Sequence, residues 1–224
     1  MERRDKMEFE YAIFDMDGTL VDSMKQWREV GSIYLRRMGI EPTRELLKIV
    51  RTKSYGEISQ IFNERFGLNL TGESLENEFF KIMKYSYHMD VVEKRGIMEY
   101  LQYLKEMNVH MCVATGTCQE LTCYTLEKLG LKDFFEFIIT CPEVGKDKRS
   151  PLIFEKALER IGGDKSNTMI FEDSLTAIKA ATEAGFKVAG VYDEVSAKDK
   201  RQICKLAKEY IYSWEELCSW ESII

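Results

Sequence analysis

The chain is poor in the residues on which several common chemistries depend. It has only two histidines, His88 and His110, among 224 residues, and neither belongs to a recognisable triad or zinc pattern. This scarcity argues against catalysis built on histidine. The cysteines form no CxxC motif and no Cys/His cluster with metal-ligand spacing; they stand at positions 112, 118, 123, 141, 204 and 218. Such cysteines are typical of reduced thiols, so we expect a cytoplasmic protein.

Long apolar runs and a strong charge of one sign are also missing. No apolar run approaches the ~20 residues that cross a bilayer, and the first eight residues are too charged for a secretory signal. Lys and Arg total 32 against 38 Asp and Glu, a net charge of −6, without a basic patch interleaved with aromatics. These observations exclude nucleic acid and membrane as expected partners. A content of 45% hydrophobic residues still allows a substantial core.

Two carboxylates stand two residues apart in the segment Asp-Met-Asp-Gly-Thr, residues 15–19, directly after an apolar run. Strand side chains alternate between faces, so Asp15 and Asp17 point the same way. Gly18 permits a tight turn, and the Thr19 hydroxyl is expected to hydrogen-bond one carboxylate. An ionised carboxylate can attack phosphorus while a protonated one supplies the leaving oxygen with a proton. The pair therefore suits phosphate chemistry, with an acidic turn or a calcium loop as the alternatives.

Two further stretches place polar groups after apolar segments. The β-branched run from Val109 ends in Thr115 and Gly116, which predicts a strand that delivers a hydroxyl to a loop. A lysine-rich loop, residues 143–150, follows and contains Lys146 and Lys148. Each stretch alone is typical of a buried strand or a solvated surface turn, and only their combination indicates a site.

A fourth stretch ends an apolar strand in adjacent acids, Glu172 and Asp173, before an apolar helix begins. Carboxylate oxygens at this place can bind a hard cation. Asp173 or Ser174 can also serve as the N-cap of the helix, a role that both residue types fill well. The two interpretations do not exclude each other.

In order and spacing these four stretches resemble the motifs of the haloacid dehalogenase-like superfamily, from about Tyr11 to the last helix. The segment from Phe14 to Ser23 closely resembles its phosphatase branch. The resemblance implies a Mg²⁺-dependent phosphatase that hydrolyses a small phosphate monoester through an aspartyl-phosphate. The expected partner is a small phosphorylated metabolite such as a sugar phosphate or phosphoglycolate, and a monomer is favoured.

The resemblance also implies a role for each residue of the site. It makes Asp15 the nucleophile and Asp17 the acid that protonates the leaving alcohol and then the base that activates water. Thr115 and Gly116 would hold the phosphoryl group. The family's lysine aligns with Lys148, but Arg149 and Leu152 depart from the usual pattern, so Lys146 remains a second candidate. The implied magnesium ligands are Asp15, the main-chain carbonyl of Asp17, Glu172 and Asp173.

The balance of charge explains why the four stretches would belong to one site. Four carboxylates in one pocket would repel a phosphate dianion. The charges of one Mg²⁺, one lysine and one proton retained on Asp17 balance those four negative charges before substrate arrives. The cation is therefore expected to be a requirement for activity.

The order of apolar segments predicts an α/β fold, a doubly wound Rossmann-like parallel sheet core with an inserted α-helical cap domain. Apolar residues recur near helical spacing after Ser23, around Ile58 and from Leu75. Residues 24–92 are therefore predicted to form the cap, and residues 1–23 and 93–224 the core. Alternating βα units imply right-handed crossovers, with the active site at the carboxyl ends of the strands.

Substrate specificity is expected to lie in the cap. Arg51, Lys53 and Tyr55 are the candidates, with an exposed polar helix end as the alternative interpretation. A sugar-phosphate mutase of the β-phosphoglucomutase type is the competing enzyme. Against it, Trp27 stands where those mutases carry a cap histidine, and Tyr55 near their arginine. A non-enzymatic binding module is the remaining alternative.

Overall fold

A computed structural model of the chain describes residues 8–218, together with all side chains of that range except those of Arg51 and Cys218. The ends of the predicted core domain, residues 1–7 and 219–224, lie outside the described residues. The strands are β1 (Tyr11–Phe14), β2 (Val21–Asp22), β3 (Val92–Glu93), β4 (His110–Thr115), β5 (Ile138–Thr140), β6 (Thr168–Glu172), β7 (Lys187–Val191) and β8 (Glu209–Ile211). The helices are α1 (Met24–Arg37), α2 (Arg44–Thr52), α3 (Tyr55–Phe66), α4 (Gly72–Met89), α5 (Ile97–Glu106), α6 (Gln119–Lys128), η1 (Lys132–Phe134), α7 (Cys141–Val144), α8 (Leu152–Ile161), α9 (Leu175–Glu183), η2 (Ala197–Asp199), α10 (Lys200–Leu206) and α11 (Trp214–Cys218).

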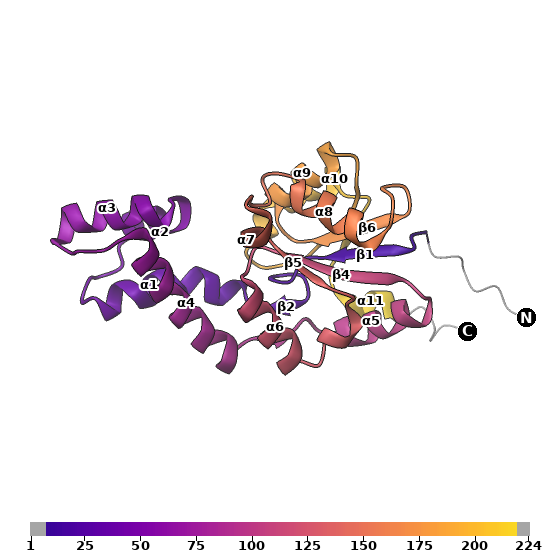
Figure 1. The fold of residues 1–224 in the computed structure, drawn as a ribbon, viewed down its shortest axis with the longest axis horizontal. Coiled ribbons are helices and arrows are strands. Elements are labelled where there is room, and N and C mark those ends of the chain that lie inside the picture. Colours follow the sequence, from indigo (N-terminus) through magenta and orange to yellow (C-terminus); the bar gives the residue numbers. More distant parts are fainter. Residues whose placement is uncertain (1–7, 219–224) are drawn as a thin grey trace, which may run out of the picture. The chain divides into compact units, whose positions relative to one another are not determined.

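Six parallel strands form the main sheet in the order β5-β4-β1-β6-β7-β8 (Figure 1). Ile13 of β1 lies between Cys112 of β4 and Ile170 of β6, so β1 is a central strand. The chain runs from β1 through β4 to β5 and then crosses to β6 on the other side. The strand order therefore reverses beside β1, where ligands bind in sheets of this kind. The predicted doubly wound sheet with a helical insertion is confirmed.

The central strands are buried on both faces. Ile13 packs in one core layer with Phe154 of α8 and Ile178 of α9. Phe14 points to the opposite face, where its ring stacks on that of Phe171 with a centroid distance of 4.5 Å. Helices α8 and α9 cover one face of the sheet, and α5 and α11 the other (Figure 1). Because both faces are covered, these strands have nearly continuous apolar sequences.

The chain divides into two compact units, one formed by residues up to Asp22 and from Val92, the other by Ser23–Val91. The second unit holds α1 to α4. Its interior contains the rings of Tyr34 and Phe79, with centroids 5.1 Å apart. Ser54 and Glu57 form a capping box that starts α3, in which each side chain accepts from the backbone N–H of the other. Local capping and an apolar stripe thus explain why this insertion is helical.

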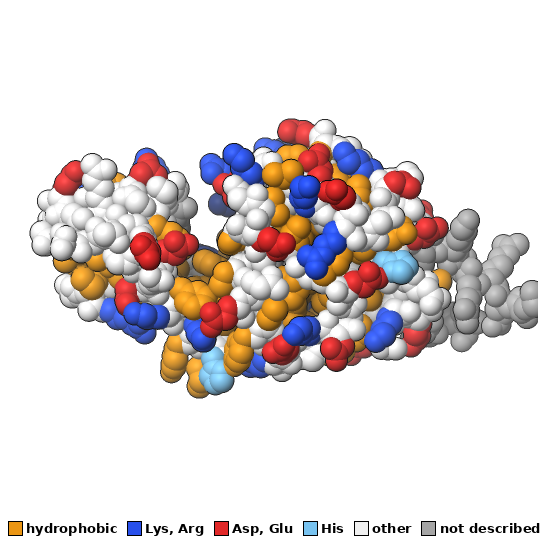
Figure 2. All heavy atoms as spheres, in the orientation of Figure 1, with side chains coloured by type: hydrophobic (Ala, Val, Ile, Leu, Met, Phe, Trp, Pro, Cys, Tyr) orange, Lys and Arg blue, Asp and Glu red, His pale blue; other side chains and the backbone are white. Residues whose placement is uncertain are grey.

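The surface charges of the molecule are mixed. Figure 2 shows acidic and basic side chains interspersed on the face that it presents. Among the described residues, no helix has the length and apolarity needed to cross a membrane.

A buried ion pair joins the segment after β3 to the loop after β7. The Lys94 N–H donates to the carbonyl of Leu20 (2.8 Å), and Lys94 Nζ lies 2.8 Å from Asp193 Oδ2. The side chains of Lys94 and Asp193 are 17% and 2% exposed. Removing one partner of a buried pair leaves the other charge without compensation.

We expect Lys94→Met to lower the free energy of unfolding by about 3 kcal/mol, because Asp193 loses its countercharge in a buried place. Urea unfolding followed by circular dichroism measures the change. The control is Lys156→Met, which breaks an exposed pair with Glu159 on α8 and is expected to cost less than about 1 kcal/mol. Equal losses for the two variants would contradict the prediction.

Candidate active site

The loop after β1 places the first two carboxylates. The Asp15 N–H donates to the carbonyl of Phe171 (2.9 Å), so Asp15 is still held by the sheet. The chain then turns sharply, with φ of +88° at Gly18, and the Gly18 N–H donates to the carbonyl of Val21 (2.9 Å). A side chain would strain this backbone. Asp15 is buried and Asp17 half-buried.

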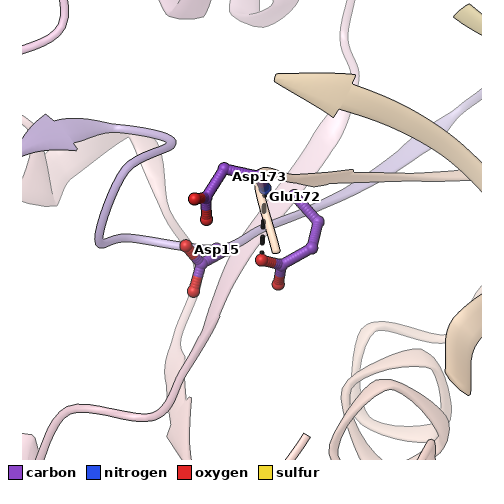
Figure 3. A group of neighbouring side chains, drawn as sticks. All are labelled: Asp15, Glu172 and Asp173. Carbon is purple, nitrogen blue, oxygen red and sulfur yellow. Dashed lines mark hydrogen bonds between the residues drawn. The ribbon is translucent and has the colours of Figure 1, made fainter. Parts of the chain in front are cut away.

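Asp15 lies beside two acids from the end of β6. Asp15, Glu172 and Asp173 are all buried, and each offers a carboxylate oxygen within 4.8 Å of the others (Figure 3). Glu172 Oε1 accepts from the N–H groups of Asp173 (3.1 Å) and Ser174 (3.0 Å). Ser174 occupies the N-cap position of α9, but its side chain makes no capping hydrogen bond. Glu172 therefore satisfies amides at the start of α9.

Lys148 supplies the positive charge of this cluster. Its Nζ donates to Asp15 Oδ1 and to Glu172 Oε2, the latter at 2.8 Å. Lys146, the second candidate for this position, is exposed. The turn between α7 and α8 thus directs Lys148 to the carboxylates, although Arg149 and Leu152 differ from the usual motif.

Acidic groups outnumber basic groups in this cluster. Burial first, and then the charge of Glu172, raise the pKa of Asp15 to about 8, although Lys148 acts in the opposite direction. Burial and the neighbouring charges of Glu172 and Asp15 also raise the pKa of Asp173. Burial alone would lower the pKa of Lys148, but the charges of Asp15 and Glu172 outweigh it and raise that pKa. Three buried carboxylates beside one lysine are a donor set that fits a hard divalent cation.

The loop after β4 adds hydroxyl and amide groups. Thr115 is buried at the end of β4, and its Oγ1 accepts from the N–H of Thr117 (3.1 Å). Because that bond uses the oxygen as acceptor, the Thr115 hydroxyl hydrogen can still be donated. Gly116 is exposed, and apart from Gly116 itself and its two chain neighbours no described residue has a heavy atom within 4 Å of the place where its Cβ would be. A ligand can therefore approach this backbone closely.

Thr117 is a site residue that the sequence analysis missed. Its Oγ1 donates to Asp17 Oδ2 at 2.6 Å. The expectation that Thr19 would bond a carboxylate is wrong, because the Thr19 hydroxyl is buried without a hydrogen-bond partner among the described residues. The only signal for Thr117 was a second hydroxyl residue in the stretch that ends β4. Residues 100 positions apart in sequence meet here.

The candidate specificity residues belong to the helical unit. Lys53 is exposed and pairs with Glu57 (2.9 Å). Tyr55 packs edge-on against Phe79, with ring centroids 5.6 Å apart. Arg51 lies in α2, and its side chain is outside the described part of the chain. Their role in specificity stays a prediction.

Known proteins resemble the chain along most of its length. A family model described as haloacid dehalogenase-like hydrolase matches residues 12–191. The chain therefore belongs to the haloacid dehalogenase-like hydrolase family, and the predicted family and enzyme class are confirmed.

Curated relatives include phosphatases of small metabolites. A phosphorylated carbohydrates phosphatase of Thermotoga maritima is 26% identical over 178 residues, covering 80% of this chain and 82% of the relative. A phosphoglycolate phosphatase of Neisseria meningitidis is 30% identical over 186 residues, covering 80% of this chain and 78% of the relative.

Solved structures share the fold. The structure of CbbY from Rhodobacter sphaeroides with xylulose 1,5-bisphosphate is 19% identical, with a TM-score of 0.78, and covers 93% of this chain and 96% of that one. A structure described as putative β-phosphoglucomutase from Thermotoga maritima is 24% identical, with a TM-score of 0.73, and covers 96% of this chain and all of that one.

Proposed function

We propose that the chain is a Mg²⁺-dependent phosphatase that hydrolyses a small phosphate monoester, a sugar phosphate or a phosphoglycolate-like metabolite, through an aspartyl-phosphate. The observation that carries this proposal is the buried Asp15 carboxylate, bonded to Lys148 and followed two residues later by Asp17. A nucleophile, a proton donor and a countercharge thus lie at the carboxyl ends of central strands. The named activities of the curated relatives support the same substrate class.

In the first step a carboxylate oxygen of Asp15 attacks phosphorus, and the bond from phosphorus to the leaving oxygen breaks. Asp17 gives its proton to that oxygen, so the alcohol departs neutral and Asp17 becomes a carboxylate. In the second step Asp17 takes a proton from water as the water oxygen attacks phosphorus. The bond between phosphorus and Asp15 then breaks, which releases inorganic phosphate and restores the Asp15 carboxylate.

The other residues of the site position the reacting groups and neutralise negative charge. Asp15, Glu172, Asp173 and the main-chain carbonyl of Asp17 are the proposed magnesium ligands. When bound there, the cation supplies positive charge that draws phosphoryl oxygens towards an acidic pocket. Lys148 holds Asp15 in place and adds its own charge, which is preorganised by its two hydrogen bonds.

Thr115 and Gly116 are the proposed donors to the phosphoryl group. The Thr115 hydroxyl hydrogen and the Gly116 N–H belong to the loop at the end of β4, next to β1 in the sheet. Donors on a rigid strand end need little reorganisation during the reaction. Residues 24–92 are the proposed cap domain, with Arg51, Lys53 and Tyr55 as its proposed specificity residues.

Trp27 favours hydrolysis over a mutase reaction. Its Nε1 donates to the Tyr87 hydroxyl at 2.8 Å inside the helical unit. An indole N–H is a donor only and cannot exchange protons with a sugar hydroxyl as a histidine can. The acid–base chemistry that a cap histidine would bring is therefore missing at this position.

The test is phosphate release from sugar phosphates, phosphoglycolate, nucleotides and p-nitrophenyl phosphate, each with Mg²⁺ or with EDTA. We expect release that requires Mg²⁺ and is fastest with one class of small alkyl phosphate. Conversion of β-glucose 1-phosphate to the 6-phosphate without phosphate release would assign a mutase instead. Inertness with every substrate would overturn the proposal in favour of a binding module.

A further inference from the structure

Thr117 lies beside Asp17 in the site, at the end of the loop that carries Thr115 and Gly116. Its hydroxyl donates to Asp17 Oδ2 at 2.6 Å, and its side chain is almost fully buried. Two backbone contacts hold the residue: its N–H donates to Thr115 Oγ1 (3.1 Å), and its carbonyl accepts from Thr122 Oγ1 (3.4 Å). The position of this hydroxyl is therefore set by the loop between β4 and α6 and not by rotation of an exposed side chain.

We propose that Thr117 is a positioning residue for Asp17: its hydroxyl binds Oδ2 and fixes the plane of the carboxyl group, which leaves Oδ1 to face the substrate. This inference rests on the proposed phosphatase reaction. A protonated carboxyl group has one donor and one carbonyl oxygen. Because Oδ2 is bonded to Thr117, Oδ1 is the oxygen that remains for the leaving group.

The same bond persists while Asp17 gives up its proton in the first step. While Asp17 is protonated on Oδ1, Thr117 fixes the plane of the carboxyl group towards the leaving oxygen. After the proton has moved and the bond from phosphorus to the leaving oxygen has broken, Thr117 donates to the new carboxylate. A hydrogen bond to a charged group is stronger than one to a neutral group. Thr117 therefore assists proton donation by stabilising its product.

The geometry also joins the acid to the phosphate loop. The N–H of Thr117 bonds the hydroxyl oxygen of Thr115, whose hydrogen is the proposed donor to the phosphoryl group. One turn thus aims Thr115 at phosphorus and holds Asp17 against the leaving oxygen. Such positioning has large kinetic effects when the reacting groups must be aligned closely.

The experiment compares leaving groups. Protonation matters for an alkoxide, which departs poorly, and much less for p-nitrophenolate. Thr117→Val keeps the shape and removes the donor. We expect it to lower kcat/KM about 30-fold for the best alkyl phosphate of the panel but less than about threefold for p-nitrophenyl phosphate. Thr117→Ser, which retains the hydroxyl, is expected to stay within about threefold of wild type for both substrates.

The matched control is Thr125→Val on α6. Thr125 is also buried, but its hydroxyl donates to the Leu121 carbonyl within the helix (2.7 Å). We expect Thr125→Val to change kcat/KM by the same factor for both substrates, if it changes it at all. The proposed role of Thr117 would be overturned if Thr117→Val lowered kcat/KM equally for the two substrates. It would also be overturned if Thr117→Ser lowered kcat/KM as much as Thr117→Val. These outcomes leave wild-type hydrolysis intact, whereas a wild type inert towards both substrates overturns the proposed function and this inference together.

Discussion

Asp15→Asn will abolish phosphate release, with kcat lowered by at least about 10⁴-fold, the scale on which loss of a nucleophile acts. The amide has the shape of the carboxylate but cannot attack phosphorus to form an aspartyl-phosphate. Initial rates of phosphate release from the best substrate, with saturating Mg²⁺, measure the effect. Residual activity above about a tenth of wild type would exclude Asp15 as the nucleophile.

A stability measurement separates lost chemistry from lost folding in this variant. Burial and the charge of Glu172 oppose ionisation of Asp15 and raise its pKa to about 8. Replacing it with a neutral side chain removes that repulsion, so thermal unfolding in EDTA is expected at the wild-type temperature or above. Asp133→Asn, an exposed residue of η1, makes the same chemical change on the surface. It is expected to alter neither activity nor stability.

Removal of Mg²⁺ is the second large effect. We expect EDTA to lower the rate at least about 10³-fold, because loss of the cation costs several kcal/mol of charge stabilisation. Added Mg²⁺ is expected to restore the full rate. The measurement is phosphate release during titration with Mg²⁺ after chelation and dialysis. Full activity in EDTA would show that Lys148 alone provides sufficient positive charge.

Asp173→Asn refines the same prediction. It removes one negative charge from the group formed with Asp15 and Glu172, so the half-saturating Mg²⁺ concentration is expected to rise at least about tenfold. The maximal rate at saturating Mg²⁺ should change less than the affinity. A Mg²⁺ titration curve identical to that of wild type would exclude Asp173 as a ligand. Asp133→Asn again serves as the control.

The sequence by itself determined the family, the sheet and the places of the acids. Apolar segments such as Phe9–Phe14 end in polar residues, and parallel strands bring their carboxyl ends to one edge. The proximity of Asp15 and Glu172 therefore follows from the order of strands and polar residues along the chain. The same holds for the helical insertion, because an apolar stripe and capping residues are local properties of the chain.

Where two residues of the same type were candidates for one role, only the tertiary structure decided between them. Lys146 and Lys148 have the same chemistry in one loop, and only the path of the turn brings Lys148 to Asp15. Thr19 and Thr117 both follow strand ends, yet Thr117 bonds Asp17 whereas the Thr19 hydroxyl has no bonding partner among the described residues.

The short strands β2 and β3 also escaped sequence analysis. A two-residue strand carries no periodic signal, and its pairing joins Val21 and Asp22 to residues about 70 positions later. The ion pair of Lys94 with Asp193 likewise joins distant segments. Sequence pattern records which face of an element is apolar, and strand order brings the ends of elements together. The direction of a single polar side chain depends on loop backbone and on partners far away in the chain, which only the folded structure specifies.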